Sequence, residues 1–420
     1  MAEDAPMFDT AAPRPPEGFG PIRPGLGAAA PRLKRKVYDT VRAHGALSRL
    51  EVARHLDVSP ATVTAAVSEL AGSGLLKEIE GGPRTSGRGR PPVAIAVEPE
   101  AGLVAGIKLS NPDSTGVITD FAGRPIASVT LPAPSGVRSV EDLLDEIVSL
   151  FEMLLSRAGP AAGKVLCVGL GLPGTVDHTA GKVLWSPILS DRMVALRSLA
   201  AGRLGLPVEI DNDANLVTLA ELWFGAGRQL ADFAVVTIEH GVGMGLVIDH
   251  RLYRGANRVG LELGHTTVQL DGALCRCGQR GCLEAYVSDY ALAREAATVL
   301  GQAAPDIASH LPFLEALHER AKAGDAAARA VFLRAGRYLA LGIANVISLY
   351  DPSTIILSGA RLQFDFLYAD DVLAEIGRQG IHAGRVPRID INSWGDLVWA
   401  RGAATLALDV ATERLTGPAA

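Results

Sequence analysis

Three cysteines and one histidine are grouped tightly beyond the middle of the chain. After His265 come nine residues, then Cys275, one residue, Cys277, four residues and Cys282. Thiolates and imidazole are the ligands of structural zinc, and four of them complete a tetrahedral site. Glycines that allow this short segment to fold round a metal stand at Gly272, Gly278 and Gly281. The spacing therefore predicts a structural Zn²⁺ site.

A second group of residues has the chemistry of a DNA contact. The run from Ser59 to Thr64 places short side chains at the start of an expected helix. There the backbone can approach base edges, and phosphates can meet the helix dipole. The predicted contact residues are Ser59, Ala61, Thr62 and Thr64. The run alone would also fit a capped surface helix in any small α-helical domain.

A loop further along carries three arginines among glycines and prolines. Arg84, Arg88 and Arg90 have no acidic neighbour within residues 83–92. Guanidinium groups on such an extended backbone fit the narrow, strongly negative minor groove of A/T-rich DNA. The composition also suits a flexible linker between domains. Together with the preceding helix, the loop favours binding to double-stranded DNA.

Composition and charge narrow the class of protein. The 420 residues are 48% hydrophobic and 20% charged, which is typical of a soluble globular protein of two or three domains. Residues 32–92 contain eleven Lys and Arg against six Asp and Glu, although the whole chain has a net charge of −6. One basic segment on an acidic body indicates one surface for nucleic acid.

Cysteine usage and the lack of targeting signals indicate the compartment. Four cysteines in a chain of this length favour a reducing cytosol, and Cys167, alone in an apolar strand, is expected in the core. The N-terminus lacks the pattern of a signal peptide, and we find no run of about 18 apolar residues. We expect a cytoplasmic protein associated with the nucleoid, not with a membrane.

The first 98 residues of the chain are predicted to contain two parts. Residues 1–31 are rich in Pro, Ala and Gly without apolar periodicity, so we expect a disordered arm. Residues 32–98 are predicted to form a winged helix-turn-helix, with helices beginning at Leu33, at Ser48 and near Ser59. Two strands follow, at Leu75–Ile79 and Val93–Val97.

Residues 99–415 alternate strands with helices, which predicts an α/β domain of two lobes with a cleft between them. The expected strands are Leu103–Leu109, Thr115–Phe121, Pro125–Leu131, Val165–Leu170, a pair within Ala234–Ile248, and Thr354–Ser358. The expected helices are Val140–Leu155, Ala214–Phe224 and a long stretch from about Phe313 to Tyr350.

Several segments closely resemble the ROK family of repressors, open-reading-frame proteins and sugar kinases. The most specific are Gly260–His265 and Cys275–Glu284, supported by Gly171–Gly174, Asp211–Asn215 and Gly241–Gly245. The resemblance covers nearly all of residues 33–410. For the α/β domain it implies an actin-like ATPase fold, which is also hexokinase-like and ribonuclease H-like. The sugar-responsive repressors of this family, for xylose, N-acetylglucosamine or glucose, are the most similar type.

The resemblance also implies a sugar site. It maps onto Asn212, Asp213, Glu262, His265 and Glu284. Carboxylates and amides bind vicinal hydroxyls through paired, charge-assisted hydrogen bonds. The zinc ion would fix the imidazole and tether the loop that carries Glu284. Taken singly, Asp213 could simply cap the following helix, and Glu262 could be an exposed acid.

Asp213 matches the general base of the family's kinases, but phosphoryl transfer also requires loops that hold the phosphates. The kinases have an Asp-x-Gly-Gly-Thr-like turn after their first strand. This chain has Lys108 at the position of the acid, and Ser110 and Asn111 at those of the glycines. We therefore expect the first phosphate site to be lost.

The second phosphate loop differs in the same direction. The kinases read Gly-Thr-Gly there, and this chain reads Glu239-His240-Gly241. A carboxylate beside a triphosphate repels it. We expect sugar binding without ATP binding and therefore no catalytic residues.

The sequence thus predicts a repressor of carbohydrate metabolism genes whose DNA affinity depends on a bound sugar. The resemblance implies a homodimer or homotetramer that reads an inverted-repeat operator. One alternative is an ATP-dependent, glucokinase-like sugar kinase with an appended DNA-binding domain. Another is a DNA-binding protein whose body only oligomerises.

Overall fold

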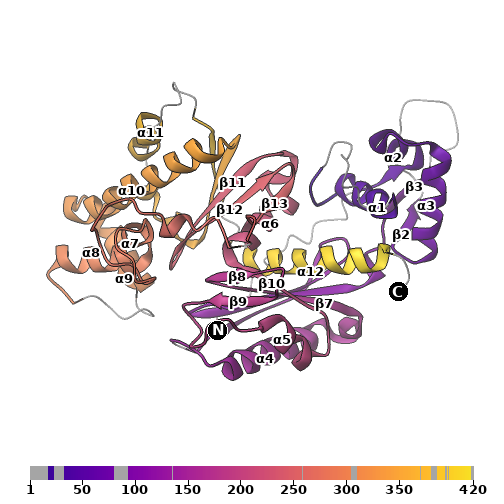
Figure 1. Cartoon of the computed structure of the whole chain (residues 1–420), viewed down its shortest axis with the longest axis horizontal. Coiled ribbons are helices and arrows are strands. Elements are labelled where there is room, and N and C mark those ends of the chain that lie inside the picture. The colour runs from indigo at the N-terminus through magenta and orange to yellow at the C-terminus, as the bar shows by residue number, and fades with distance from the viewer. Residues whose placement is uncertain are drawn as a thin grey trace. The chain divides into compact units, whose positions relative to one another are not determined.

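Two compact units make up the part of the chain that the structure, a computed structural model, describes (Figure 1). The first contains the residues up to Ala101, together with Phe121–Gly123 and the residues from Thr412 onward. The second contains Gly102–Asp120 and Arg124–Ala411. The described residues are 18–22, 33–79, 93–134, 136–257, 259–303, 310–368, 370–379, 386–392, 395 and 397–417.

The first unit combines three helices with a small antiparallel sheet. The helices are α1 (Leu33–His44), α2 (Arg49–Leu56) and α3 (Pro60–Gly72). The strands β1 (Leu47–Ser48), β2 (Leu76–Ile79) and β3 (Ala94–Val97) pair in the order β1-β3-β2, and the 3-10 turn η1 (Pro99–Ala101) follows. The three predicted helices and both predicted strands are present. The sequence did not predict β1, which is only two residues long.

Side-chain caps fix where α2 and α3 begin. Ser48 accepts a hydrogen bond from the backbone N–H of Glu51, and the Glu51 carboxylate accepts one from the backbone N–H of Ser48. This is the predicted capping box. Ser59 accepts from the backbone N–H of Thr62 and so starts α3. The helices pack around a core that includes Val37, Val41, Val52, Val63, Val67 and Leu70.

Residues 18–22 differ from the disordered arm expected for residues 1–31. Phe19 is buried, its backbone N–H donates to the carbonyl of Arg42, and the Arg42 guanidinium lies 5.8 Å from the centre of its ring. The aromatic side chain supplies the apolar contact that the composition of the segment did not suggest. The other residues of the arm lie outside the described residues.

The first unit also includes the end of the last helix, α12 (Val398–Thr416). Arg35 of α1 donates from Nη1 to the carboxylate of Glu413 over 3.0 Å. Leu33 and Lys34 line a groove together with Thr416 and Gly417. The two ends of the described chain therefore meet in one folded unit.

The second unit contains two five-stranded sheets with the same connectivity. Each has its first strand in the middle, two antiparallel strands on one side and two parallel strands on the other. The first sheet, in the order β10-β7-β4-β5-β6, consists of β4 (Leu103–Lys108), β5 (Asp113–Asp120), β6 (Pro125–Pro132), β7 (Val165–Leu172) and β10 (Val208–Asn212). The second, in the order β13-β12-β11-β14-β15, consists of β11 (Phe233–Ile238), β12 (Val242–Ile248), β13 (Arg251–Tyr253), β14 (Thr354–Ser358) and β15 (Arg388–Asn392).

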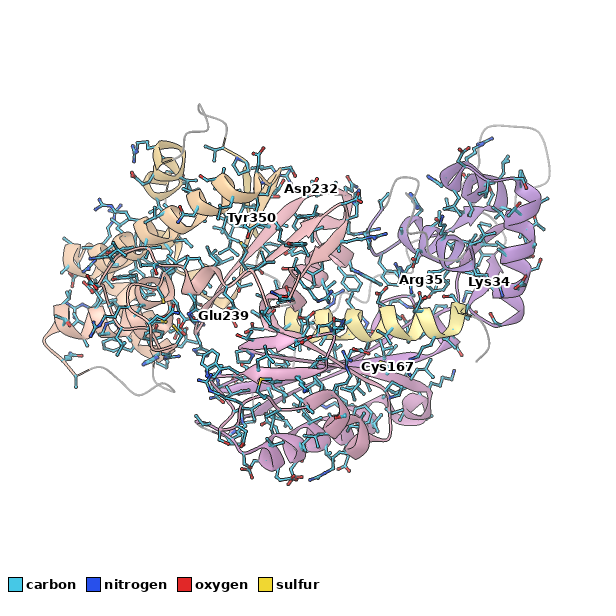
Figure 2. All side chains as sticks on the ribbon, viewed as in Figure 1. Lys34, Arg35, Cys167, Asp232, Glu239 and Tyr350 are labelled. Carbon is cyan, nitrogen blue, oxygen red and sulfur yellow. The ribbon has the colours of Figure 1, made fainter. Side chains whose placement is uncertain are left out.

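Helices cover both faces of the first sheet (Figure 1). One face packs on α4 (Val140–Ala158) and α5 (Leu196–Leu204). On the other, α12 lies directly on the strands, because Gly106 and Gly169 have no side chain to hold it away. A Cβ atom at Gly106 would lie 2.1 Å from the carbonyl oxygen of Ala400. Cys167 of β7 is buried, as predicted (Figure 2).

The second sheet belongs to the helix-rich lobe. Its helices are α6 (Asp213–Phe224), α7 (Glu284–Val287), α8 (Asp289–Leu300), α9 (His310–Lys322), α10 (Ala326–Tyr350) and α11 (Asp370–Gln379). Short elements complete the unit: the β8 (Thr175–Asp177) and β9 (Lys182–Trp185) hairpin, and the 3-10 turns η2 (Gly159–Lys164), η3 (Ala226–Gln229), η4 (Leu263–His265), η6 (Ala360–Gln363) and η7 (Asp365–Tyr368). The predicted mixed α/β domain of two lobes is thus observed.

The long helical stretch expected from Phe313 to Tyr350 is two helices. Gly324 has φ +98°, and Asp325 caps α10 by accepting from the backbone N–H groups of Ala327 and Ala328. The dipeptide Gly324-Asp325 is a signal for a helix break, but the apolar periodicity on both sides of it led to the prediction of one continuous helix. By length and composition alone α10 could cross a membrane, yet 61% of its most apolar window is buried inside the protein. It is a core helix of the second lobe.

Candidate functional site

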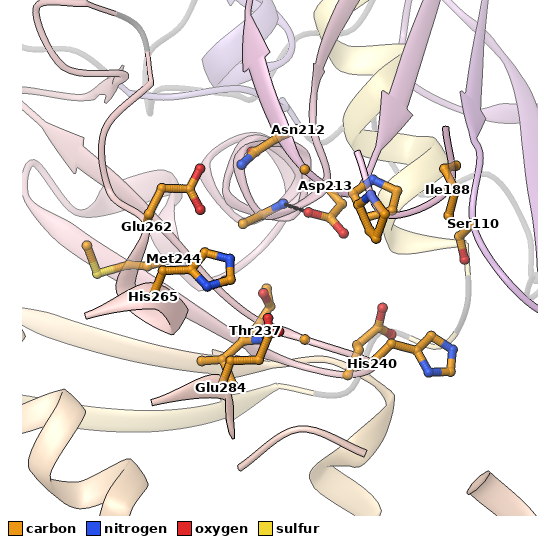
Figure 3. A pocket seen from close by; sticks show the side chains of 18 of the residues that line it. Ser110, Ile188, Asn212, Asp213, Thr237, His240, Met244, Glu262, His265 and Glu284 are labelled. Carbon is orange, nitrogen blue, oxygen red and sulfur yellow. Dashed lines mark hydrogen bonds between the residues drawn. The ribbon is translucent and has the colours of Figure 1, made fainter. Parts of the chain in front are cut away.

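One cavity gathers all five residues predicted to bind sugar. It measures about 170 Å³ and is lined by Asn212, Asp213, Glu262, His265 and Glu284, among other residues (Figure 3). Carboxyl ends of strands from both sheets border it: Lys108 ends β4, Asn212 ends β10, and Glu239 follows β11. Ligands of α/β proteins bind at this edge of a parallel sheet.

The junction of β10 and α6 positions Asn212 and Asp213. The side chain of Asn212 accepts a hydrogen bond from the backbone N–H of Asn215, so Asn212 is the N-cap of α6. The alternative in which Asp213 caps this helix is therefore wrong. Asp213 is the first helical residue, and its Oδ1 accepts from the backbone N–H of Ala214 at 2.9 Å. From this position Asp213 lines the cavity.

Burial and neighbouring charges change the pKa of Asp213. Desolvation by burial is the largest cause; Lys108 lowers the pKa and Glu239 raises it, and the net effect is a rise from 3.8 to about 6. At neutral pH the carboxyl is therefore mostly ionised and can accept a hydrogen bond from a hydroxyl. A carboxyl with a pKa near the working pH is also typical of a general base.

Glu262 reaches the cavity from the loop that precedes η4. Leu261 has φ +72°, a conformation that is uncommon for a residue with a branched side chain and that turns the loop just before Glu262. Thr175 of β8 donates to Oε1 of Glu262 over 3.4 Å. Burial raises the pKa of Glu262. The interpretation of Glu262 as an exposed acid is therefore wrong.

Glu284 begins α7 and faces the hairpin between β11 and β12. Its Oε2 accepts from the backbone N–H of Val242 over 3.4 Å. A Cβ atom at Gly241 would lie 2.7 Å from the same oxygen, so a larger residue there would make the Glu284 carboxylate shift. In this chain Gly241 therefore lies directly beside the Glu284 carboxylate.

The four predicted metal ligands form a single cluster. One ligand atom each of His265, Cys275, Cys277 and Cys282 lies within 4.8 Å of all the others. The Sγ atoms of Cys277 and Cys282 are 3.7 Å apart, and Cys275 Sγ is 3.6 Å from His265 Nδ1. Zn–S bonds of about 2.3 Å in a tetrahedron place sulfur atoms about 3.8 Å apart. The residues fit a bound metal ion.

Glycines and a tyrosine shape the loop around this cluster. Gly278 and Gly281 have φ of +92° and +78°, the left-handed region that other residues rarely adopt. A Cβ atom at Gly272 would lie 2.0 Å from the hydroxyl of Tyr286, which accepts a hydrogen bond from the backbone N–H of Ala273. The three glycines identified in the sequence are each required by a turn or by a close approach.

The residues at the two phosphate-loop positions contact each other. Lys108 Nζ lies 3.1 Å from Oε2 of Glu239 and 3.7 Å from the centre of the Trp399 ring. The sequence indicated that each residue is unsuited to a nucleotide, but it did not indicate that they form a pair. The partners are 131 positions apart: Lys108 ends β4 of the first sheet, and Glu239 follows β11 of the second.

A buried charge network that the sequence did not reveal lies next to Glu239. Asp289 at the start of α8 accepts from Nε and Nη2 of Arg361, both at 2.6 Å. The same carboxylate lies 2.9 Å from Nδ1 of His240. These partners keep the pKa of Asp289 below its usual value despite burial. His240, which lines the cavity, is thereby held in one orientation (Figure 3).

The predicted DNA contacts are only partly within the described residues. Ser59, Ala61, Thr62 and Thr64 are all exposed, on the first turns of α3. The hydroxyl of Thr64 donates a hydrogen bond to the carbonyl of Pro60, and the hydroxyl oxygens of Ser59 and Thr62 are 2.6 Å apart. Arg84, Arg88 and Arg90 lie outside the described residues.

Comparison with known families agrees with these features. Residues 106–410 match the ROK family. The chain belongs to the ROK family. Among curated relatives, the xylose repressor of Caldicellulosiruptor bescii is 29% identical over 355 residues, which cover 83% of this chain and 88% of the repressor. The DNA-binding transcriptional dual regulator NagC of Escherichia coli is 26% identical over 353 residues, covering 83% and 85%.

Solved structures of ROK proteins share this fold. A ROK transcriptional regulator, a homologue of the Escherichia coli MLC protein, superposes with a TM-score of 0.76 at 24% identity and covers 91% of this chain and 96% of its own. The ROK glucokinase of Streptomyces griseus, solved with glucose and AMPPNP, gives a TM-score of 0.62 at 30% identity. It is covered over 99% of its length but matches only 73% of this chain. The kinase therefore has no counterpart for more than a quarter of the chain.

Proposed function

We propose that this ROK protein is a DNA-binding transcriptional repressor of carbohydrate metabolism genes whose operator affinity is changed by a bound sugar. The observation that carries the proposal is the single cavity in which Asn212, Asp213, Glu262 and Glu284 converge beside the histidine–cysteine cluster. Carboxylates and an amide in this arrangement suit the hydroxyls of one monosaccharide. The curated relatives, named as repressors or regulators, support the link to transcription.

The first unit is proposed to be a winged helix-turn-helix. Two observations support this: α2 and α3 are short, consecutive and capped, and a β2–β3 hairpin follows them. In this motif α3 enters the major groove with its N-terminal residues, here Ser59, Ala61, Thr62 and Thr64, next to the bases. The arginines at 84, 88 and 90, between β2 and β3, would contact the minor groove.

The cluster of His265 and three cysteines is proposed to hold a structural Zn²⁺. Four protein ligands leave no open position, so the ion would stabilise the fold and would not activate water. Its task would be to fix the loop between His265 and Glu284, since both ends of this loop border the cavity.

We propose further that the chain is not an enzyme. A nucleotide phosphate would meet the carboxylate of Glu239, and Lys108 is already engaged by that carboxylate. The competing function, a glucokinase-like sugar kinase, is favoured by one observation, the raised pKa of Asp213. Sugar-dependent ATP hydrolysis by the pure protein separates the two. We expect none, and turnover near the usual kinase range of 1 to about 100 per second would establish the kinase.

The repressor is proposed to act as a homodimer or homotetramer on an inverted-repeat operator, in the cytoplasm on the nucleoid. Its test combines two titrations. Calorimetry with a panel of hexoses, pentoses and N-acetylated amino sugars should find at least one ligand. Fluorescence anisotropy with DNA from the upstream region of the gene should then show an affinity that this ligand lowers. A DNA affinity unchanged by every sugar would contradict the proposal, and a body that only oligomerises would bind none.

A further inference from the structure

The ion pair of Lys108 and Glu239 crosses the cavity between the two sheets. Lys108 is the last residue of β4 in the first sheet, and Glu239 directly follows β11 in the second. Their side chains are only 10% and 18% exposed, and Trp399 covers the ammonium group from α12. In the low local dielectric such a pair is held more firmly than a surface ion pair.

The cavity is otherwise rich in negative charge. Among the described residues that line it, four carry carboxylates and two carry permanent positive charges. The carboxylates are those of Asp213, Glu239, Glu262 and Glu284, and the cations are Lys108 and Arg276. The Arg276 guanidinium lies 4.0 Å from the centre of the Tyr290 ring, and its charge acts on Glu284. Both cations therefore already have a negative or aromatic partner.

A phosphorylated ligand would be strongly disfavoured in this cavity. Its dianionic group needs donors with positive charge. To supply Lys108, the protein would have to break the pair and place the Glu239 carboxylate beside the phosphate. Breaking one partner of a shielded pair is costly, and the like charges of phosphate and carboxylate would add to that cost.

Resting on the proposed sugar-binding function, we propose that the effector is an unphosphorylated sugar and that the Lys108–Glu239 pair is the determinant that excludes sugar phosphates. The pair adds no net charge to the cavity. It also occupies the space beside Asp213 in which a phosphate could otherwise bind Lys108. Discrimination of this kind depends on a repulsive element as much as on favourable contacts.

Matched pairs of ligands test the proposal on the full-length protein. The probes are D-glucose and glucose 6-phosphate, N-acetylglucosamine and its 6-phosphate, and D-xylose and xylose 5-phosphate, each titrated by calorimetry. We expect the tightest ligand to be an unphosphorylated member that binds at least about tenfold more tightly than its phosphate. Tighter binding of any phosphate than of its parent sugar would overturn the proposal while leaving a sugar-binding regulator. Binding of no probe would overturn the proposed function as well.

Two variants identify the residues responsible. In Glu239→Gln the shape is kept but Lys108 loses its partner, so the preference for the unphosphorylated sugar should fall about tenfold or more. Exchange of the two charges, in Lys108→Glu with Glu239→Lys, should restore it. The control is Glu375→Gln, which removes an acid paired with Arg378 on the surface of α11. An unchanged preference in a folded Glu239→Gln protein would disprove the role of the pair.

Discussion

Arg254 donates to one oxygen of Asp211 from two nitrogens, with Nε at 2.8 Å and Nη2 at 2.7 Å from Oδ2. The other oxygen of Asp211 accepts from the backbone N–H of Asn212 and from the side chain of Asn215. Asp211 is 1% exposed, and Arg254 follows β13 of the second sheet. The carboxylate therefore fixes the turn that presents Asn212 and Asp213 and anchors it to the opposite lobe.

Asp211→Asn should destabilise the protein and weaken sugar binding. The change leaves the Arg254 charge without its carboxylate in a shielded place, which costs about 3 kcal/mol in the free energy of unfolding. Denaturant unfolding and calorimetry with the best sugar measure the two effects. The control is Asp145→Asn, whose partner Arg203 lies 2.9 Å away on an exposed surface. Equal stability of both variants would contradict the assigned role of Asp211.

Loss of a zinc ligand should abolish the response to sugar. Cys277→Ser should lower the zinc content of the purified protein and loosen the loop that carries Glu284, because metal binding is coupled to folding of such loops. Elemental analysis and sugar-dependent release of operator DNA are the measurements. Cys167→Ala removes a buried thiol outside the cluster and should keep both properties. A zinc-free variant that still responds normally would remove the metal from the mechanism.

Asp213→Asn should stabilise the folded protein at high pH only. The carboxyl has a pKa of about 6 when folded against 3.8 as the unperturbed value, so the folded state holds its proton more tightly. The free energy of unfolding therefore falls as the pH rises from 3.8 to 6. Above about pH 6 the total loss caused by this carboxyl is about 3 kcal/mol. The variant should melt at a higher temperature than the wild type at pH 8, and this gain should vanish toward pH 4. A gain independent of pH would argue against the raised pKa.

Arg88→Ala combined with Arg90→Ala should weaken operator binding without changing sugar affinity. Each lost phosphate contact lowers the slope of log affinity against log salt by about 1. Fluorescence anisotropy at several salt concentrations gives this slope. As a matched control, Arg378→Ala with Arg388→Ala removes two exposed arginines of the second unit that are paired with nearby acids. If both double variants behave alike, the loop does not contact DNA.

The sequence predicted the elements whose cause is local. Ser48 with Glu51, and Ser59 with Thr62, are caps whose partners are three residues apart, so their spacing alone located α2 and α3. Strand β14, at Thr354–Ser358, was placed at its observed bounds because a buried central strand is a continuous apolar run. The histidine–cysteine cluster could also be predicted from the sequence, because its four residues lie within one short segment.

Features that depend on distant residues were missed. Phe19 packs on α1 although its own segment has no periodicity, and β1 exists only because β3 pairs with it. The contact of Lys108 with Glu239 and that of Asp289 with Arg361 join segments far apart in the sequence. The polar residues predicted to bind sugar line one cavity, and their role in binding stays a prediction. Which charges neutralise one another required the tertiary structure.

The last turn of α12 has a consequence for biosynthesis. Glu413 pairs with Arg35 inside the unit that carries α3, so that unit is assembled from both termini of the described chain. A ribosome releases the residues near Arg35 long before it adds those near Glu413. A nascent polypeptide therefore lacks part of this unit until α12 has been synthesised, and a fragment that ends before α12 would lack the Arg35–Glu413 pair.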